Sequence, residues 1–454
     1  MISVIMKELS LVFKGKMRKK SSMLKCCCFF FVYSSATTTA AQQQTKKEAL
    51  LLLRLSPPVS CFRRFEITGS GFYIRLQVLF GAVTLNSSRR SMSSLISSTG
   101  SSSLRPFTTV YGRGLLEEVK FIANRKYVIV TMEDLWKIPS FPSAFASDSG
   151  NYEVYFVKSL EAKDLKSDLQ KLQGKIGEPI RCVVGVGGGQ AIDVAKFFSW
   201  SLGNITLFQV PTALTVDAPW GHRAAIRYEG VVRYVGFAVP EAVYIDYGII
   251  QSAPKRLNLS GVGDVLCFHT ADADWRIAQE DSKCGNWPYD EDIANLAKEK
   301  LNLMVNNLSE IKDMTEKAIR IICTAFQFGG AAFHAFGWNP RPLEGFDHLF
   351  FYALEHRTRK HFIHGYPVML GIFLGSLLQN NRAEWVLDVI KNGCGIDIRP
   401  EEMKISWEDV KKTLLGLKDF VKENDYMYTI ASRVDITEEF IEKARVMLYD
   451  FYAK

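Results

Sequence analysis

A glycine-rich turn between two apolar segments, at residues 181–196, constrains the fold more than any other feature of the chain. The run Cys182–Gly185 predicts a buried strand, and the segment Ala191–Ser201 predicts a helix. Four glycines of the turn lack the Cβ atoms that would keep an anion from the backbone: Gly185, Gly187, Gly188 and Gly189. The helix beginning near Gln190 directs the positive end of its dipole to the same place. The turn therefore predicts a dinucleotide phosphate site, although Gln190 stands where a G-x-G-x-x-G fingerprint requires glycine.

Short β-rich runs alternate with helical stretches over residues 106–253. Five runs predict strands: Lys126–Thr131, Tyr152–Val157, Cys182–Gly185, Thr206–Val210 and Ala242–Asp246. Stretches such as Leu160–Leu172 have a helical period, and Tyr228–Ala238, divided by Glu229 and Gly230, predicts a hairpin at the rim of the sheet. This alternation predicts a Rossmann-like α/β domain with a parallel sheet.

Helical periodicity dominates residues 254–454. The predicted helices are Ile293–Asn307, Met314–Phe328, Gly365–Leu378, Trp385–Asn392, Trp407–Asn424 and Thr437–Phe451. We therefore predict an α/β domain followed by an all-α domain, with the active site in the cleft between them.

The N-terminal extension, residues 1–105, differs from the rest in composition. It is rich in Ser and Thr and holds 16 Lys and Arg against three acids, whereas the remainder holds 40 basic and 45 acidic residues. We expect the extension to be disordered, and its composition fits either a mitochondrial or plastid transit peptide or sequence upstream of a start at Met92. The protein would then be cytoplasmic or organellar. The mildly acidic body predicts no nucleic-acid partner, and no apolar run reaches the length of a membrane span.

Five segments occur in the order of a known superfamily. They are Gly187–Lys196 (G-G-G-x-x-x-D-x-A-K), Pro211–Pro219, Gly261–Asp264 (G-x-G-D), the pair Asp347-His348, and His361–Gly365 (H-x-x-H-G). They resemble the metal-dependent polyol and alcohol dehydrogenases, which include glycerol dehydrogenase, glycerol-1-phosphate dehydrogenase, iron-containing alcohol dehydrogenase and dehydroquinate synthase. The resemblance extends over residues 106–454 and implies the dehydroquinate synthase-like fold, in which an all-α part follows the dinucleotide-binding part. It also implies a homo-oligomer.

The resemblance implies a metal-dependent dehydrogenase that uses NAD or NADP and one divalent metal, Zn²⁺ or Fe²⁺. Asp264, His348 and His364 match the metal ligands, and one aspartate with two imidazoles suits either ion. His361 is then a neighbour of the metal site or of the substrate. The implied substrate is a small polyol or its ketone, and sn-glycerol 1-phosphate with dihydroxyacetone phosphate is the preferred pair.

Further residues are assigned to cofactor and substrate. The resemblance implies that seven residues bind the cofactor: Gly187, Gly188, Gly189, Gln190, Asp193, Thr212 and Thr215. It places Asp217 beside the substrate as a catalytic residue, although Asp217 also suits a turn before Ala218-Pro219. His269, five residues after Asp264, is a second catalytic candidate; the alternative is a helix residue bonded to a neighbour.

Three alternatives stay open. In the first, the protein is a dehydrogenase whose substrate is glycerol or a simple alcohol. In the second, it is a lyase like dehydroquinate synthase. In the third, it is a non-catalytic NAD-binding paralogue. Trp220–Arg223 and Leu343–Phe346 are bulkier than we expect from the family, which indicates a remodelled substrate pocket. Five basic residues are candidates to bind a substrate phosphate: Arg341, His222, Arg223, Lys255 and Arg256.

Overall fold

A computed structural model describes residues 25–28, 53–56, 65–69, 72–76, 108–123, 126–335 and 339–453. The chain divides into two compact units, residues 1–103 and 104–454. In the first unit, β1 (Lys25–Cys28) pairs with β2 (Leu53–Ser56), and β3 (Phe65–Gly69) pairs with β4 (Phe72–Leu76), both antiparallel. The rest of the extension lies outside the described residues, so its expected disorder and its identity as a transit peptide or upstream sequence stay predictions.

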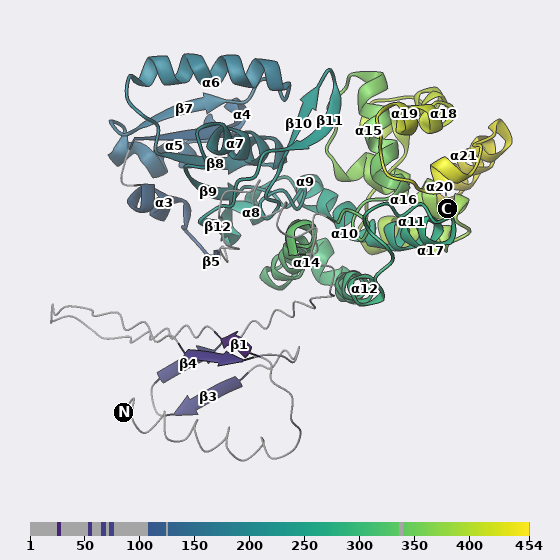
Figure 1. Cartoon of the computed structure of the whole chain (residues 1–454), viewed down its shortest axis with the longest axis horizontal. Helices are drawn as coiled ribbons and strands as arrows, with labels where there is room; N and C mark the ends of the chain where they lie inside the picture. Colours follow the sequence, from purple (N-terminus) through teal and green to yellow (C-terminus); the bar gives the residue numbers. More distant parts are fainter. Residues whose placement is uncertain are drawn as a thin grey trace. The chain divides into compact units, whose positions relative to one another are not determined.

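A six-stranded, wholly parallel sheet forms the first part of the second unit (Figure 1). Its strands are β5 (Thr108–Gly112), β6 (Tyr127–Thr131), β7 (Tyr152–Phe156), β8 (Cys182–Gly187), β9 (Thr206–Pro211) and β12 (Ala242–Asp246). They lie in the order β5-β12-β9-β8-β6-β7, with β8 near the centre. The five predicted strands are confirmed. The edge strand β5, which is only partly buried, was not predicted.

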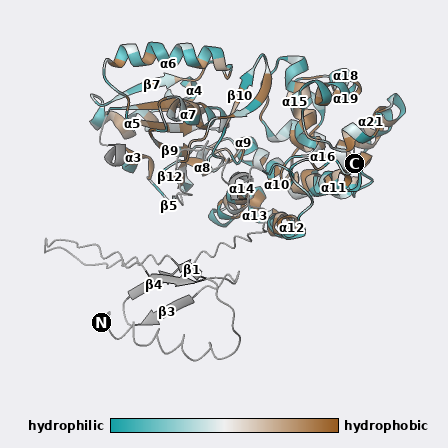
Figure 2. Cartoon of the chain, in the orientation of Figure 1, coloured by the Kyte–Doolittle hydropathy of each residue, from teal (hydrophilic) through white to brown (hydrophobic). Residues whose placement is uncertain are grey.

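Both faces of the sheet are buried by helices. In β6, Tyr127 and Ile129 pack with α3 (Leu116–Ala123) and α5 (Ser140–Phe145), while Val128 and Val130 pack with α6 (Ala162–Ile176) and α7 (Gly189–Ser201). Alternate residues of a strand point to opposite faces, so a strand covered on both sides must be apolar throughout. Figure 2 shows the outer surface of α6 as mainly hydrophilic, as its amphipathic pattern requires. The short helix α4 (Glu133–Trp136) follows β6.

The predicted hairpin is present, but it does not belong to the rim of the large sheet. β10 (Ala224–Tyr228) and β11 (Val231–Val235) form a separate two-stranded sheet with its turn at Glu229 and Gly230. The hairpin lies between the parallel sheet and helix α15 (Figure 1). It therefore brings side chains of the α/β part next to the helical part.

The second part is helical, as predicted. Its helices are α8 (Tyr247–Ser252), α9 (Lys255–Leu259), α10 (Gly263–Leu266), α11 (Phe268–Glu280), α12 (Glu291–Val305), α13 (Leu308–Asp313), α14 (Glu316–Ala335), α15 (Phe346–Thr358), α16 (Gly365–Leu378), α17 (Ala383–Asp388), α18 (Trp407–Leu415), α19 (Leu417–Glu423), α20 (Ile430–Arg433) and α21 (Glu438–Ala453). The predicted helix Trp407–Asn424 is two helices, because the chain bends at Gly416. α16 is buried along most of its length and packs against α10 and α15.

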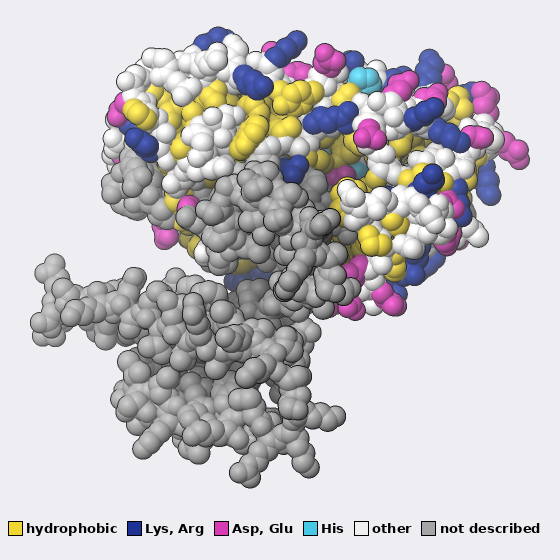
Figure 3. All heavy atoms as spheres, in the orientation of Figure 1, with side chains coloured by type: hydrophobic (Ala, Val, Ile, Leu, Met, Phe, Trp, Pro, Cys, Tyr) yellow, Lys and Arg dark blue, Asp and Glu magenta, His cyan; other side chains and the backbone are white. Residues whose placement is uncertain are grey.

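The predicted fold class is confirmed: a Rossmann-like parallel sheet is followed by helices. The boundary between two domains near residue 253 stays a prediction. On the face drawn in Figure 3, acidic and basic side chains of the described residues are interspersed. Within the described part of the chain, no helix is both long and apolar enough to cross a bilayer.

Candidate active site

A cavity of about 380 Å³ lies between the end of the parallel sheet and the helices. Its walls include the glycine turn after β8, the loop after β9, the hairpin β10–β11, and residues of α10, α15 and the segment before α16. Six predicted cofactor residues line it: Gly188, Gly189, Gln190, Asp193, Thr212 and Thr215. The seventh, Gly187, ends β8 and is not part of the lining.

The glycine turn depends on two close approaches. Gly187 has a φ of 156°, and a Cβ there would lie 2.8 Å from the Cβ of Ala191. A Cβ at Gly189, the first residue of α7, would lie 2.7 Å from Val216 Cγ2. The turn is therefore held tightly against the start of α7, whose first N–H groups have no partner within the helix. Such a helix start favours the binding of phosphate.

Lys196 holds one wall of this cavity together. Its ammonium lies 2.8 Å from Asp193 Oδ1 and donates to the carbonyl oxygens of Ala218 (3.0 Å) and Arg223 (2.6 Å). The side chain is 2% exposed. The ammonium thus bonds two backbone carbonyls and forms an ion pair with Asp193, and α7 is tied to both ends of the segment 218–223.

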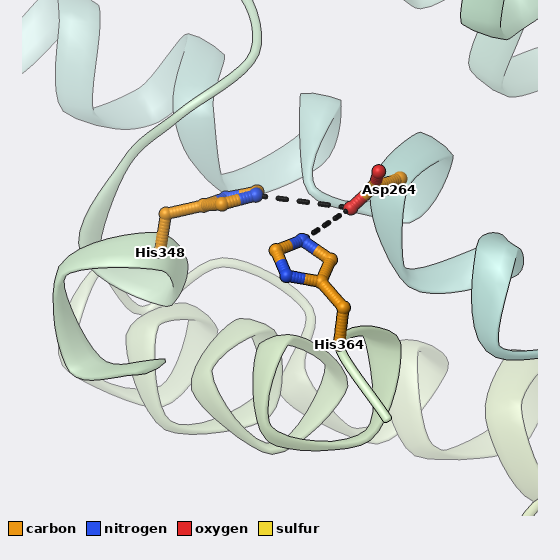
Figure 4. A group of neighbouring side chains, drawn as sticks. All are labelled: Asp264, His348 and His364. Carbon is orange, nitrogen blue, oxygen red and sulfur yellow. Dashed lines mark ion pairs between the residues drawn. The ribbon is translucent and has the colours of Figure 1, made fainter. Parts of the chain in front are cut away.

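Asp264, His348 and His364 come together although 84 and 16 residues separate them in turn (Figure 4). Asp264 lies on α10, His348 on the first turn of α15, and His364 directly before α16. His364 Nε2 lies 2.8 Å and His348 Nε2 3.8 Å from the same oxygen, Asp264 Oδ1. Their candidate ligand atoms all lie within 4.8 Å of one another.

Glycines permit this arrangement. A Cβ at Gly365, next to His364, would collide with the carbonyl oxygen of Ser260, and a Cβ at Gly263, next to Asp264, would lie 2.8 Å from the carbonyl oxygen of Gly365. The backbones of α10 and α16 therefore touch at Gly263, which precedes Asp264, and at Gly365, which follows His364. Without a glycine at 365 the two side chains would be forced apart.

The residues present fit a divalent cation. Asp264 Oδ1 is buried and has no hydrogen-bond partner among the described residues, while Oδ2 accepts the backbone N–H of Asp217 at 3.1 Å. Burial opposes the negative charge of Asp264, but the imidazoles of His364 and His348 outweigh it and lower the pKa of this carboxyl. An acceptor that faces two imidazole nitrogens and lacks a hydrogen matches a metal ligand set of one carboxylate and two histidines.

Asp217 lines the same cavity, and its catalytic role stays a prediction. Burial, and then the negative charge of Asp264, raise the pKa of its carboxyl. A Cβ on Gly329 would lie 2.6 Å from Asp217 Oδ2, so α14 passes close to the carboxyl group.

The structure does not bring His269 to the triad. Its Nε2 lies 2.9 Å from the carbonyl oxygen of Asn381, and its ring packs on Trp385 with 4.9 Å between centroids. The residue is not part of the cavity lining. We assign it no catalytic role, and it corresponds to the alternative of a helix residue bonded to a neighbour.

The remaining candidates are His361 and the five basic residues, and most of them do not line the cavity. His361 lies outside the triad and contacts Glu355 at 3.2 Å. Of the five candidates for a substrate phosphate, only Arg223 lines the cavity. The guanidinium of Arg341 instead donates to the backbone carbonyls of Lys283 and Tyr428.

Several residues of the site were not predicted. His348 Nδ1 lies 2.5 Å from Asp347 Oδ1, and Asp347 Oδ2 accepts the hydroxyl of Thr270 at 2.6 Å. Glu344 lines the cavity with Tyr234 and Tyr352. The signal for Asp347 was its position next to the matched histidine, and the signal for Glu344 was the departure of Leu343–Phe346 from the family pattern.

A hairpin-to-helix ion pair closes another part of the cavity wall. Arg227 Nη2 on β10 donates to both carboxylate oxygens of Glu355 on α15, at 3.0 and 2.7 Å. The carboxylate also contacts His361, and the charge of Arg227 and the His361 bond outweigh burial and lower the pKa of Glu355.

Known proteins resemble this chain in sequence and in fold. The family model for iron-containing alcohol dehydrogenase matches residues 120–254. The glycerol-1-phosphate dehydrogenase [NAD(P)+] of Methanocorpusculum labreanum is 32% identical over 271 residues, which cover 59% of this chain and 72% of that protein. The enzyme of the same name from Thermofilum pendens is 27% identical over 340 residues, covering 73% of this chain and 94% of that protein. The solved structure of glycerol dehydrogenase from Schizosaccharomyces pombe has a TM-score of 0.56 at 20% identity and covers 77% of this chain and 91% of its own.

The relatives and the family model show a dehydrogenase of the alcohol and polyol class. The chain belongs to the iron-containing alcohol dehydrogenase family, in its glycerol-1-phosphate dehydrogenase group. The predicted class of reaction, an NAD(P)-linked oxidation of a small alcohol or polyol, is confirmed.

Proposed function

We propose that the protein interconverts dihydroxyacetone phosphate and sn-glycerol 1-phosphate with NAD(H) or NADP(H). The observation that carries this proposal is one cavity that joins a phosphate-binding glycine turn to a carboxylate and two imidazoles. The relatives of 32% and 27% identity, both named glycerol-1-phosphate dehydrogenase [NAD(P)+], support the substrate.

The chain's own residues would divide the work between cofactor and substrate. The turn at Gly188 and Gly189 would bind the cofactor pyrophosphate, with Gln190, Asp193, Thr212 and Thr215 along the same wall. Bound there, the nicotinamide would supply or accept the hydride. Lys196 would hold segment 218–223 in place, since its ammonium bonds the carbonyl oxygens of Ala218 and Arg223 and pairs with Asp193.

Asp264, His348 and His364 would hold one Zn²⁺ or Fe²⁺, which when bound polarises the substrate oxygen as a Lewis acid. Asp347 would keep the His348 ring turned so that Nε2 faces Asp264. Asp217, with its raised pKa, would lie beside the substrate and take part in proton transfer with its oxygen. Arg223 is the residue of the lining best suited to a substrate phosphate.

An uncharged polyol or its ketone is a second candidate substrate. Glu344 favours it, because an acidic side chain that lines the cavity disfavours a phosphate nearby. Dihydroxyacetone and glycerol are the corresponding pair.

Initial rates of NADH and NADPH oxidation would separate these candidates. The protein, supplied with Zn²⁺ or Fe²⁺, is tested with dihydroxyacetone phosphate, dihydroxyacetone and a series of short aldehydes. The expected result is oxidation of NADH or NADPH in the presence of dihydroxyacetone phosphate. The product should be one that sn-glycerol-3-phosphate dehydrogenase cannot oxidise. Turnover of dihydroxyacetone alone would select the second candidate, and no turnover in protein that holds metal and cofactor would contradict both.

A further inference from the structure

A buried cluster of one carboxyl group and two phenols stands beside the triad. Glu344 Oε1 accepts the hydroxyl of Tyr234 at 2.8 Å and the hydroxyl of Tyr352 at 3.1 Å. The two hydroxyl oxygens lie 3.1 Å apart. The three residues come from the segment before α15, from β11 and from α15, so both parts of the fold contribute to the cluster.

The cluster belongs to the same cavity as the triad. All three of its residues line that cavity, and the ring of Tyr352 lies 6.1 Å from the ring of His348 between centroids. The lining also includes the apolar residues Val232, Leu343 and Phe351. A polar group of the substrate near the triad would find hydrogen-bond partners in this cluster that these apolar residues do not offer.

Glu344 has bonding capacity left. Both phenols donate to Oε1, and no described residue bonds Oε2. Burial raises the pKa of Glu344, so the protonated form is favoured more than in water. A hydroxyl group can donate to an ionised carboxylate or accept from a protonated carboxyl, and therefore suits Oε2 in either state. A phosphate would be repelled by the ionised form.

We propose that Glu344, oriented by Tyr234 and Tyr352, binds the free hydroxymethyl group next to the carbon that is oxidised or reduced. The inference deepens the proposed function and rests on it. It makes Glu344 a specificity-determining residue that selects ketones bearing a hydroxyl on the adjacent carbon. It also directs a substrate phosphate to the opposite end of the substrate, away from this cluster.

A pair of substrates that differ by one hydroxyl tests this role. Dihydroxyacetone phosphate is compared with hydroxyacetone phosphate, in which hydrogen replaces the free hydroxyl, by measuring kcat/KM for the metal-loaded full chain. Loss of a hydrogen-bonded hydroxyl leaves its buried partner unpaired, so we expect wild type to prefer the hydroxylated ketone by about tenfold or more. Glu344→Met, which keeps the volume and removes the acceptor, should bring the two values within about threefold of each other.

Two further variants and one control variant keep the test decisive. Glu344→Gln keeps an acceptor and should retain part of the preference. Tyr352→Phe removes one donor to Oε1 without touching the backbone and should lower the preference by about threefold, which matters if Glu344→Met does not fold. Glu439→Gln, at an exposed position, should leave both values unchanged.

The possible failures are distinguishable. Turnover of dihydroxyacetone phosphate with equal efficiency for both ketones, or a preference that survives in Glu344→Met and Tyr352→Phe, overturns the role of Glu344 alone. If wild type reduces only uncharged ketones, the same comparison is made with hydroxyacetone and acetone, which differ by the one hydroxyl on the carbon next to the carbonyl. A protein that reduces neither pair overturns the proposed function and the role of Glu344 with it.

Discussion

Asp347 Oδ1 lies 2.5 Å from Nδ1 of the adjacent His348, and the other oxygen of the same carboxylate accepts the hydroxyl of Thr270. The carboxylate can only accept, so His348 Nδ1 carries the hydrogen, and Nε2, which faces Asp264, is the nitrogen that could bind a metal. A carboxylate behind a ligating imidazole is the usual arrangement of a metal site.

Asp347→Asn should therefore lower metal affinity by about 10- to 100-fold while the protein stays folded. The amide offers either a weaker acceptor or a donor to His348 Nδ1, and the ring orientation is no longer fixed. Competition with a chromophoric chelator measures the affinity, and excess metal should restore activity. Asp313→Asn, at an exposed site, is the control. Wild-type affinity in Asp347→Asn would show that the pair does not orient the ring.

Gly365→Ala should disrupt the triad. Its Cβ collides with the carbonyl oxygen of Ser260, which belongs to backbone and cannot rotate away. We expect a loss of about 1–3 kcal/mol in the free energy of unfolding and a protein with sharply reduced metal content. Gly174→Ala is the matched control, since Gly174 lies in the exposed part of α6 with no atom near its Cβ position. It should be neutral or stabilising by up to about 1 kcal/mol. Equal behaviour of the two variants in urea unfolding would contradict the contact.

Lys196→Met should destabilise the protein more than removal of an exposed lysine. The change leaves Asp193 and two backbone carbonyls without their shared cation inside the cavity wall, which costs about 3–5 kcal/mol for a buried pair. Lys171→Met removes an exposed partner of Asp168 and should cost less than about 1 kcal/mol. Both values come from chemical unfolding. If the two variants lose similar amounts of stability, Lys196 does not tie α7 to segment 218–223.

His222 should make stability depend on pH in a defined window. Burial, and then the charge of Lys196, lower its pKa to about 4, whereas the unfolded value is about 6.5. The folded state thus binds this proton less readily than the unfolded state. The contribution of neutral His222 to the free energy of unfolding is complete above about pH 6.5 and is lost as the pH falls toward 4. The difference in unfolding free energy between wild type and His222→Gln should change by about 3 kcal/mol across this window.

The opposite sign is expected for His361, which provides the control. Its bond to Glu355 raises its pKa, so its contribution is present below about pH 6.5 and lost as the pH rises through the folded value. His361→Gln should therefore give a difference curve that slopes the other way. Parallel slopes for the two variants would contradict the environments described for them.

Much of the fold follows from periodicity, while the site depends on contacts that periodicity cannot show. The β8 strand and α7 helix are predictable because one is continuously apolar and the other follows a glycine turn. Helix α15, which holds His348, was not predicted, since it is buried on almost every side and has no polar face to mark a period. Edge strand β5 is short and mostly half-exposed, so its pattern is equally weak.

The metal triad is recognisable in the sequence only by family order. A gap of 16 residues between His348 and His364 crosses the end of α15 and a turn, so no helix face relates them. His269 illustrates the converse: five helical positions after Asp264 correspond to a rotation of about 140°, which points the side chain away from the cavity. Glu344 lies in an irregular segment, and its partners on β11 and α15 are set by tertiary packing alone.

The most direct test of the central claim is the rate of NAD(P)H oxidation with dihydroxyacetone phosphate by metal-loaded wild type and by Asp264→Ala, measured together with NADH binding by fluorescence. The triad and the glycine turn occupy different walls of one cavity, so the variant should lose turnover and metal while retaining cofactor affinity close to that of wild type. Undiminished turnover in dialysed, metal-stripped Asp264→Ala would contradict the metal site and the proposed reaction that depends on it.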